Sequence, residues 1–369
     1  MSGKLKIIHV ITDKNIGGAG RWLLNFLEFY DRESFEAKVI LPADSLLAPE
    51  IEKLYTEVIC IEDLQESSYD KEAVGKFRKV FSEEKPDVVH THASLAARMA
   101  AKAENVPLTV NTKHCMEDLN VGFIKKQLRK TVTKKYTDLV IAVSEAVRDS
   151  LIEGGCPEKM VRTVYNGVKP MKRRPGEEVC AFRESFGFSD EDFVVGMAAR
   201  LEDIKDYDAF IKAAYEVREK ASDIKFLIMG TGSEEERLKN LANSLNLNGT
   251  LAFAGFVSDM ELAMNALDLN ALTSKSEAIS LSVIEGMTLG LPSVCSNTGG
   301  IPEAVEDGVT GELFPVGNEK ALAEKIISLK NDSAKREKYS ENAKITAAEK
   351  FSPEKMCRET EKLYRQFIK

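Results

Sequence analysis

The sequence predicts an α/β protein made of two doubly wound, Rossmann-like domains. Short apolar runs rich in β-branched residues alternate with longer helical segments along most of the chain. This alternation is typical of a parallel sheet covered by helices on both faces. At 369 residues the chain is too long for one hydrophobic core and suits two.

The predicted strands form two series separated by a connecting segment. The first series covers residues 5–11, 37–41, 58–61, 88–91, 108–111, 139–143 and 161–164. The second covers residues 193–198, 225–229, 250–254, 267–272 and 293–296. Residues 169–176 are rich in proline and charge and lack periodicity, which indicates an interdomain connection. We therefore expect domains over residues 1–169 and 170–352, followed by a helix from about Pro353 to Phe367.

Composition argues against several classes of protein. The net charge of −8 disfavours a general nucleic-acid binder, which would carry a basic excess. No apolar run approaches the ~20 residues that cross a bilayer. The N-terminus enters a strand directly and lacks the apolar stretch of a signal peptide. We therefore expect a cytoplasmic protein.

Residues 273–305 read as a loop, a short helix, a short strand and a Gly-Gly turn. Ser280 or Ser282 is the expected N-cap of the helix. Glu277 would then lie just before the helix N-terminus and Glu285 in its first turns, beside the positive end of the helix dipole. Such a pocket suits an anionic, hydroxyl-rich ligand. The alternative is a capping box from Ser282 to Glu285, in which Glu285 would satisfy only the backbone.

Two cations follow the first strand of the second series. Arg200 lies at the strand end and Lys205 near the start of the next helix, so both can bind one diphosphate. The alternative is a pair of solvated surface cations. Asp206 and Asp208 form a D-x-D pattern like some metal motifs, but they stand where a helix begins, so N-terminal capping is the better account. We expect no metal.

Glycines follow several predicted strands. Gly17 and Gly18 open a helix after the first strand. One interpretation of these glycines is a dinucleotide-binding turn. The pattern G-x-G-x-x-G is absent, however, and no acidic residue stands at the end of the second strand, so this interpretation is disfavoured. Gly232 and Val257 follow later strands and are expected to line the ligand site through their backbone.

The histidines divide according to their place on the predicted strands. His92 and His114 follow strand ends, where ligands of such sheets bind. His9 and His90 lie within strands, and we expect structural roles for them. No Ser/His/Asp triad or metal-ligand cluster is evident in the sequence.

The segment E-(x7)-E from Glu277 to Glu285, with E-G-M-x-x-G-x-P and then G-G-I-P-E, closely resembles the donor-sugar signature of the retaining GT-B-type glycosyltransferases of family 4. The R-L-x-x-x-K that starts at Arg200 and the T-x-H that ends at His114 are similar to further motifs of that family. The resemblance covers almost the whole chain. One departure is that many members have E-G-F-G-L where this chain has E-A-I-S-L.

The resemblance implies a GT-B fold, in which two domains face a central cleft and the C-terminal helix, within residues 353–369, packs back on the first domain. It implies metal-independent, retaining transfer from a nucleoside diphosphate sugar, with no cofactor. A UDP-sugar is the favoured donor and GDP-mannose the second. Together, the residues and the resemblance assign catalysis to His114, Glu277, Arg200 and Lys205, donor binding also to Gly17, Gly18, Gly232, Val257, Ser280, Leu281, Ser282 and Glu285, and the acceptor side to His92.

Two rival functions stay open at this point. A sugar-nucleotide 2-epimerase shares the two-domain fold but needs acids and bases beside the sugar C2. A non-catalytic sugar-nucleotide-binding subunit would activate a partner enzyme instead. For a transferase of this family, the expected role is cell-surface polysaccharide or glycolipid synthesis with a hydroxyl acceptor, possibly lipid-linked.

The segment between Val121 and Tyr136 predicts a basic amphipathic helix. Apolar residues fall on one helical face, and the remainder carries six basic residues and no acid. Such a helix can lie peripherally on an anionic membrane surface, here the inner face of the cell membrane. The alternative is a solvated helix whose apolar stripe packs on the sheet.

Overall fold

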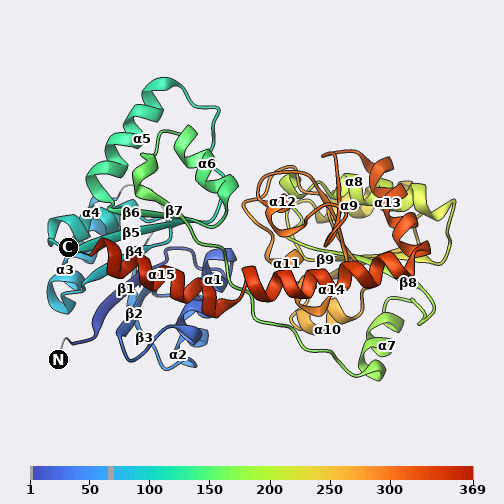
Figure 1. Ribbon diagram of the computed structural model, residues 1–369, viewed down its shortest axis with the longest axis horizontal. Coiled ribbons are helices and arrows are strands. Elements are labelled where there is room, and N and C mark those ends of the chain that lie inside the picture. The colour runs from blue at the N-terminus through green and yellow to red at the C-terminus, as the bar shows by residue number, and fades with distance from the viewer. Residues whose placement is uncertain (1–2, 65–69, 369) are drawn as a thin grey trace. The chain divides into compact units, whose positions relative to one another are not determined.

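The computed structural model describes residues 3–64 and 70–368, and the chain divides into two compact units (Figure 1). Unit 1 comprises Met1–Gly167 and Ser352–Lys369, and unit 2 comprises Val168–Phe351. The chain thus passes between the units after residues 167 and 351, whereas the sequence placed these passages after residues 169 and 352.

Unit 1 is built on a seven-stranded sheet in the order β3-β2-β1-β4-β5-β6-β7. Every neighbouring pair is parallel, as the sequence predicted. The strands are β1 (Leu5–Val10), β2 (Phe35–Pro42), β3 (Glu57–Ile61), β4 (Val88–Thr91), β5 (Leu108–Lys113), β6 (Leu139–Ala142) and β7 (Val161–Thr163). The strand order reverses between β1 and β4, which is where ligands of doubly wound sheets bind.

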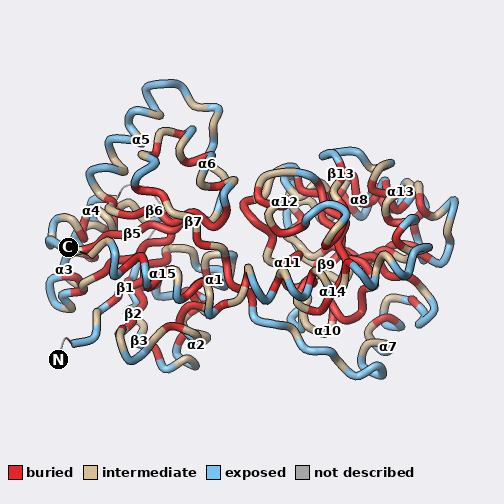
Figure 2. The backbone as a smooth tube through the Cα atoms, viewed as in Figure 1, coloured by how far each residue is buried: buried red, intermediate tan, exposed pale blue. Residues whose placement is uncertain are grey.

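Helices cover both faces of this sheet, and the buried residues gather along its strands (Figure 2). The helices of unit 1 are α1 (Gly18–Phe29), α2 (Ala48–Glu52), α3 (Lys71–Glu84), α4 (Leu95–Ala103), α5 (Phe123–Tyr136), α6 (Glu145–Glu153), the 3-10 helix η1 (Glu158–Met160) and α15 (Pro353–Phe367). One core contains Trp22 and Phe26 of α1, and the other contains Phe77 and Phe81 of α3.

The C-terminal helix α15 belongs to unit 1, where it packs beside α1. Ser352 caps it and Pro353 occupies its first turn, which explains why its start was readable from the sequence. Tyr364 of α15 is fully buried in the same core as Trp22. The end of the chain thus packs in the same core as residues of β1, β4 and β5.

Unit 2 repeats the architecture with six parallel strands in the order β10-β9-β8-β11-β12-β13. The strands are β8 (Phe193–Ala198), β9 (Ile224–Met229), β10 (Leu251–Gly255), β11 (Leu269–Leu272), β12 (Ser293–Ser296) and β13 (Gly311–Phe314). The helices are α7 (Gly176–Glu184), η2 (Asp203–Lys205), α8 (Tyr207–Arg218), α9 (Glu235–Ser244), α10 (Met260–Asn265), α11 (Leu281–Leu289), α12 (Ile301–Ala304), α13 (Glu319–Asn331) and α14 (Ser333–Lys350).

The sequence did not predict β13. Its four residues include Glu312, a poor strand residue, which is buried here because Lys325 and Lys335 pair with its carboxylate. Those lysines come from α13 and α14, so the pairing exists only in the folded unit.

The predicted connection at residues 169–176 is bound along unit 2. The amide of Met171 donates to Thr288 Oγ1 over 3.0 Å, and the amide of Lys172 donates to Glu261 Oε2 over 2.8 Å. Side chains remote in sequence therefore satisfy a backbone that lacks secondary structure of its own.

Helix α5 does not pack its apolar residues on the sheet. All 14 of its residues are described and none is buried. Phe123, Ile124 and Leu128 are 75%, 84% and 60% exposed. The packing alternative raised by the sequence is therefore wrong for Ile124 and Leu128, the two members of the predicted stripe that are exposed. Within residues 3–64 and 70–368, no helix combines the length and apolar character that crossing a bilayer demands.

Candidate functional site

In unit 2, the residues singled out by the sequence lie around the N-terminus of α11. Ser280 is the N-cap, and its hydroxyl accepts a hydrogen bond from the amide of Val283 over 3.4 Å. Ser282 is therefore inside the helix, and Glu285 lies two positions beyond the one a capping-box residue would occupy. The capping-box alternative for Glu285 is wrong. Glu285 is 8% exposed, so its burial needs another explanation.

Glu277 lies in the loop before α11 with a side chain that is only 11% exposed. Its carboxylate pairs closely with the ammonium of Lys205 and accepts a hydrogen bond from Ser274 Oγ over 2.9 Å. Ser274 is a site residue that the sequence did not single out, although it stands three residues from Glu277. An ion pair this enclosed is held more firmly than a surface pair.

Two hydrogen bonds to backbone carbonyls of η2, the 3-10 helix that carries Lys205, hold the loop of Glu277 in place. Thr273 Oγ1 donates to the carbonyl of Lys205 over 2.9 Å, and the amide of Lys275 donates to the carbonyl of Ile204 over 2.8 Å. The position of Glu277 relative to Lys205 is thus fixed by main-chain geometry as well as by charge.

The Gly-Gly turn after β12 approaches this same loop. Gly299 has a φ of +50°, and a Cβ built on it would lie 1.9 Å from the carbonyl oxygen of Glu277. The amide of Gly300 donates to that oxygen over 3.0 Å. Gly299 is therefore required for the close approach of the loop that carries Glu277.

Gly232 has a comparable constraint beside Arg200. A Cβ on Gly232 would lie 2.3 Å from the carbonyl oxygen of Leu201, and a Cβ on Gly230 would lie 2.0 Å from that of Ala199. These glycines let the loop after β9 pack against the loop that carries Arg200. Whether the backbone of Gly232 or Val257 also contacts a nucleotide stays a prediction.

Arg200 and Lys205 differ in their surroundings. The Arg200 side chain is 76% exposed and pairs with Glu202 over 2.7 Å. The Lys205 side chain is 18% exposed. Arg200 is therefore free to reorient toward a ligand, whereas Lys205 is already held in place.

The two aspartates of the D-x-D pattern lie at the start of α8, as expected, but Asp206 does not cap the helix with its side chain. Asp206 occupies the N-cap position of α8 with a φ of +50°, but its side chain makes no capping bond. Asp208 lies in the first turn and forms an ion pair with Arg237 at 2.6 Å. The predicted side-chain cap is thus wrong for Asp206. A cavity of about 300 Å³ beside these residues is lined by five acidic and three basic side chains, and this acidic excess disfavours a diphosphate there.

In unit 1, Gly17 and Gly18 start helix α1 after β1. Gly17 is the N-cap, without a side-chain capping bond. A Cβ built on Gly18 would meet nothing within 4 Å. The space beside Gly18 is therefore open, whereas a Cβ on Gly17 would lie 3.6 Å from Asp13 Oδ2.

All four histidines of the chain meet at the same end of the unit 1 sheet. His9 lies on β1 and His90 on β4, while His92 and His114 follow β4 and β5. His90 Nδ1 is 2.6 Å from the hydroxyl of Tyr364, and His90 Nε2 is 2.6 Å from Thr112 Oγ1. His90 thereby joins α15 to the sheet, which is a structural role.

The remaining histidines form a row. His92 Nδ1 lies 2.9 Å from His114 Nε2, and His92 Nε2 lies 3.4 Å from His9 Nδ1. The chain turns sharply after His92, because Ala93 has a φ of +114°, which is rare for a residue with a side chain. Strain of this kind is common at functional sites.

Burial keeps these imidazoles neutral at physiological pH. It lowers the pKa of His9 and of His114 to about 3. Burial also lowers the pKa values of His90 and His92 well below the ordinary value, and the neighbouring histidines add to this effect.

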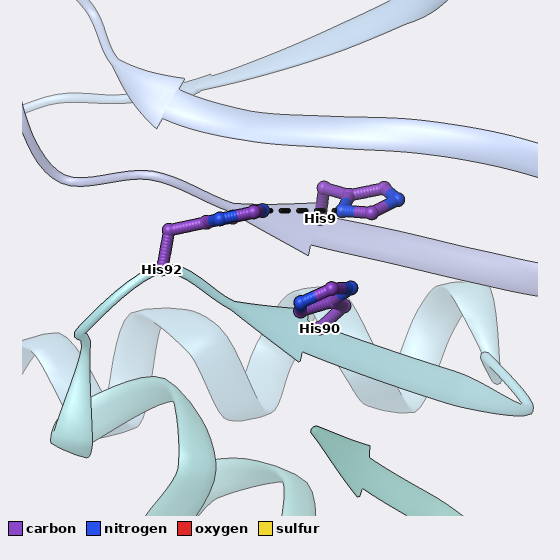
Figure 3. Close-up of side chains that lie close together, drawn as sticks. All are labelled: His9, His90 and His92. Carbon is purple, nitrogen blue, oxygen red and sulfur yellow. Dashed lines mark hydrogen bonds between the residues drawn. The ribbon is translucent and has the colours of Figure 1, made fainter. Parts of the chain in front are cut away.

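Three of the histidines come close enough to suggest a metal site. One nitrogen from each of His9, His90 and His92 lies within 4.8 Å of the others (Figure 3). However, the rings of His90 and His92 are stacked with an interplanar angle of 15°, so their in-plane lone pairs do not converge on one point. Both nitrogens of His90 also have hydroxyl partners. This geometry does not fit tetrahedral coordination.

Comparisons with known proteins agree with this arrangement. The profile of the family described as Glycosyltransferase Family 4 matches residues 16–172, and that of Glycosyl transferases group 1 matches residues 180–346. N-acetyl-alpha-D-glucosaminyl L-malate synthase of Bacillus anthracis is 26% identical over 313 residues, which is 80% of this chain and 79% of that protein.

A second relative is the UDP-Gal:alpha-D-GlcNAc-diphosphoundecaprenol alpha-1,3-galactosyltransferase of Escherichia coli, 25% identical over 350 residues and 89% of each chain. Among solved structures, Anabaena HepE in complex with UDP has a TM-score of 0.86 at 23% identity, covering 98% of this chain and 100% of that one. Because the two profiles together span most of the chain and both sheets have the expected architecture, the chain belongs to the GT-B glycosyltransferases of the family 4 type.

Proposed function

We propose that this glycosyltransferase moves a sugar from a nucleoside diphosphate sugar to an acceptor hydroxyl, with retention at the anomeric carbon and without a metal ion. A UDP-sugar is the favoured donor and GDP-mannose the second. HepE has been solved with UDP and with UDP-glucose, and the E. coli relative is named for a UDP-galactose donor and a lipid diphosphate acceptor. These relatives support a role in cell-surface polysaccharide or glycolipid synthesis.

The ion pair between Lys205 and Glu277 carries the proposal. A diphosphate that binds Lys205 takes the cation away from Glu277, whose carboxylate is almost enclosed. Sugar hydroxyls are hydrogen-bond donors that can replace the lost partner. The pair therefore matches a ligand with a diphosphate and hydroxyl groups side by side. A free nucleoside diphosphate lacks the sugar hydroxyls that follow the β-phosphate, so it would not supply this replacement.

In the proposed step, the bond between the anomeric carbon and the diphosphate oxygen breaks, and its electron pair stays on the diphosphate. Lys205, Arg200 and the positive end of α11 stabilise this charge. The acceptor oxygen bonds to the anomeric carbon on the same face, and its proton passes to a phosphate oxygen of the leaving group. His114 and Glu277 position the sugar, Glu285 binds the ribose, and Ser280, Leu281 and Ser282 contact the sugar and β-phosphate.

The donor base is tested by thermal shift with UDP, GDP and ADP at equal concentrations. UDP is expected to raise the melting temperature most and GDP second, because a ligand that binds the folded state stabilises it by mass action. Nucleotide release from a UDP-sugar is then measured with and without a polyprenyl-diphosphate-linked sugar. A binding subunit would release no nucleotide in either case, and an epimerase would convert the donor without an acceptor.

Metal independence follows from the two cations that take a metal's place at the diphosphate. Activity is expected to survive excess EDTA. Loss of activity that magnesium or manganese restores would contradict this part of the proposal.

Helix α5 is the proposed contact with an anionic membrane, where a lipid-linked acceptor would be found. Its exposed apolar residues Phe123, Ile124 and Leu128 stand beside basic residues and no acid within the helix. Each basic residue near an anionic surface contributes roughly 1 kcal/mol before salt screening. Arg129 already pairs with Glu117, so the lysines carry most of this attraction. We place the protein in the cytoplasm, peripherally on the inner face of the membrane.

Vesicle co-sedimentation tests this contact. Binding is expected to anionic vesicles at low salt, with weak binding to neutral vesicles and release by salt. Replacing the exposed α5 lysines Lys125, Lys130, Lys134 and Lys135 by Ser should abolish the preference. The matched control replaces four exposed lysines on other helices by Ser, at 320, 338, 344 and 362. If both quadruple variants lose binding equally, the contact is not specific to α5.

A further inference from the structure

We infer that His9 and His92 are positioning residues that hold His114 as the tautomer with its proton on Nδ1. His114 then offers an N–H donor to an oxygen of the ligand at this end of the unit 1 sheet. The inference rests on the proposed function only for the identity of that ligand. The tautomer itself is a property of the free protein.

The three rings are coupled because each neutral imidazole carries one proton on one of two nitrogens. In the row, His9 Nδ1 faces His92 Nε2, and His92 Nδ1 faces His114 Nε2. Each contact needs one N–H and one bare nitrogen. All three rings must therefore be protonated on Nδ1, or all three on Nε2. A mixed row would leave two lone pairs or two protons facing each other.

The two ends of the row decide between these arrangements. His9 Nε2 and His114 Nδ1 are both buried without a hydrogen-bond partner among the described residues. If the rings were protonated on Nε2, the fully buried His9, whose ring lies 4.9 Å from that of Phe26 between centroids, would carry an N–H without a partner. A stranded N–H of this kind is rare in folded proteins.

Protonation on Nδ1 moves the unpaired N–H to the other end of the row. His114 follows the end of β5 and is partly exposed, whereas His9 is fully buried, so only this end of the row lies near the surface, although Nδ1 itself is covered in the ligand-free protein. A hydroxyl, carbonyl or phosphate oxygen of the substrate can accept from it. Since the lone N–H is satisfied on ligand binding in this arrangement alone, the structure favours it.

His90 does not take part in the row. Its two nitrogens face Tyr364 and Thr112, and both hydroxyls can donate or accept. Either tautomer of His90 is therefore compatible with the row. Thr112→Val, which removes one partner of His90 and none of the row, is the matched control.

The test is long-range proton–nitrogen NMR on the full chain labelled with ¹⁵N-histidine, which reports eight ring nitrogens from four residues. We expect protonated Nδ1 and bare Nε2 at His9, His92 and His114 at neutral pH. A protonated Nε2 at His114, a charged imidazolium or metal-shifted nitrogens would each overturn the inference. This measurement on the wild type needs no variant to fold.

Variants then show whether the row does the positioning. His9→Asn keeps an N–H near the place of Nδ1, so it should preserve the His114 tautomer, whereas His9→Phe should yield a mixture of tautomers. With His9→Phe, kcat/KM for transfer should fall about tenfold, the size of one misplaced hydrogen bond, and His9→Asn should recover most of it. Equal tautomer populations at His114 in both variants would contradict the role of His9.

Failure of the two proposals can be told apart. If His114 carries its proton on Nδ1 and no sugar is transferred, the proposed function is wrong and the tautomer assignment stands. If sugar is transferred by a protein whose His114 carries its proton on Nε2, the positioning role is wrong and the proposed function stands.

Discussion

The candidate site residues of the two units differ in charge. In unit 2, Lys205 and Glu277 are paired ions beside the N-terminus of α11, held by loops that hydrogen-bond to each other. In unit 1, the corresponding groups are histidines whose pKa values are lowered by burial, so they are neutral. Charge suits binding of a diphosphate, whereas neutral donors and acceptors suit hydroxyl groups. Under the proposed function, the charged groups that bind the diphosphate therefore come from unit 2, whereas unit 1 contributes neutral groups.

The largest expected effect concerns pH and separates the units most directly. The folded pKa of His9 and of His114 is about 3, below the ordinary 6.5. The unfolded state therefore binds more protons than the folded state between pH 6.5 and about 3. The contribution of each such histidine to the free energy of unfolding is complete above pH 6.5. It falls by about 1.4 kcal/mol per pH unit as the pH drops through this window.

Thermal melts of the full chain at pH 7 and pH 5 check this prediction. All four histidines precede residue 168, so unit 1 should lose stability while unit 2 changes little. A transition of unit 1 that stays constant from pH 7 to pH 5 would show that the histidines are not buried as neutral groups.

The second prediction concerns the ion pair of unit 2. Lys205→Ala should weaken UDP binding by about 1.5–3 kcal/mol, the range for hydrogen bonds to charged groups, and lower the melting temperature by leaving Glu277 without its cation. Adding Glu277→Gln to Lys205→Ala should restore part of the melting temperature and none of the UDP affinity. Calorimetry that finds wild-type UDP affinity for Lys205→Ala would rule out the phosphate contact.

Arg200→Ala should weaken UDP binding within the same range, without the effect on stability.

The third prediction compares a glycine from each unit. Gly299→Ala should displace the loop of Glu277, because the new Cβ would collide with its carbonyl oxygen, and donor turnover should fall at least about tenfold. Gly18→Ala meets no atom within 4 Å, so its melting temperature should stay near that of the wild type. A loss of turnover in Gly18→Ala at unchanged melting temperature would place a ligand against α1. Wild-type turnover of Gly299→Ala would contradict the account of that turn.

The smallest effect is expected at the second glutamate of unit 2. Glu285→Gln should weaken binding of the bare nucleotide by about 0.5–1.5 kcal/mol, the range for one ordinary hydrogen bond. Glu277→Gln should instead reduce turnover more than UDP affinity, because its proposed partners are sugar hydroxyls. Equal UDP affinity in wild type and Glu285→Gln would remove the ribose contact from the proposal.

Much of the fold was readable from the sequence because local signals and burial agree in doubly wound sheets. Strands β1 to β12 carry apolar runs, and the caps of α11 and α15 stand at readable places. Strand β13 was missed because the burial of Glu312 depends on lysines from two later helices. The packing alternative for α5 failed because periodicity shows which residues share a face and not what covers that face.

The sequence by itself determined the two-domain α/β architecture, the start of α11 to within two residues and the residue types of the proposed donor site. These depend on short spacings, which a chain carries without its fold. Only the tertiary structure decided that Lys205 pairs with Glu277, that Gly299 makes room for a loop, and that three histidines form one row. Each of these contacts joins segments far apart in the chain. Which residues make these contacts depends on how loops and strands pack in the folded protein, and the spacing of residues along the sequence does not specify that packing.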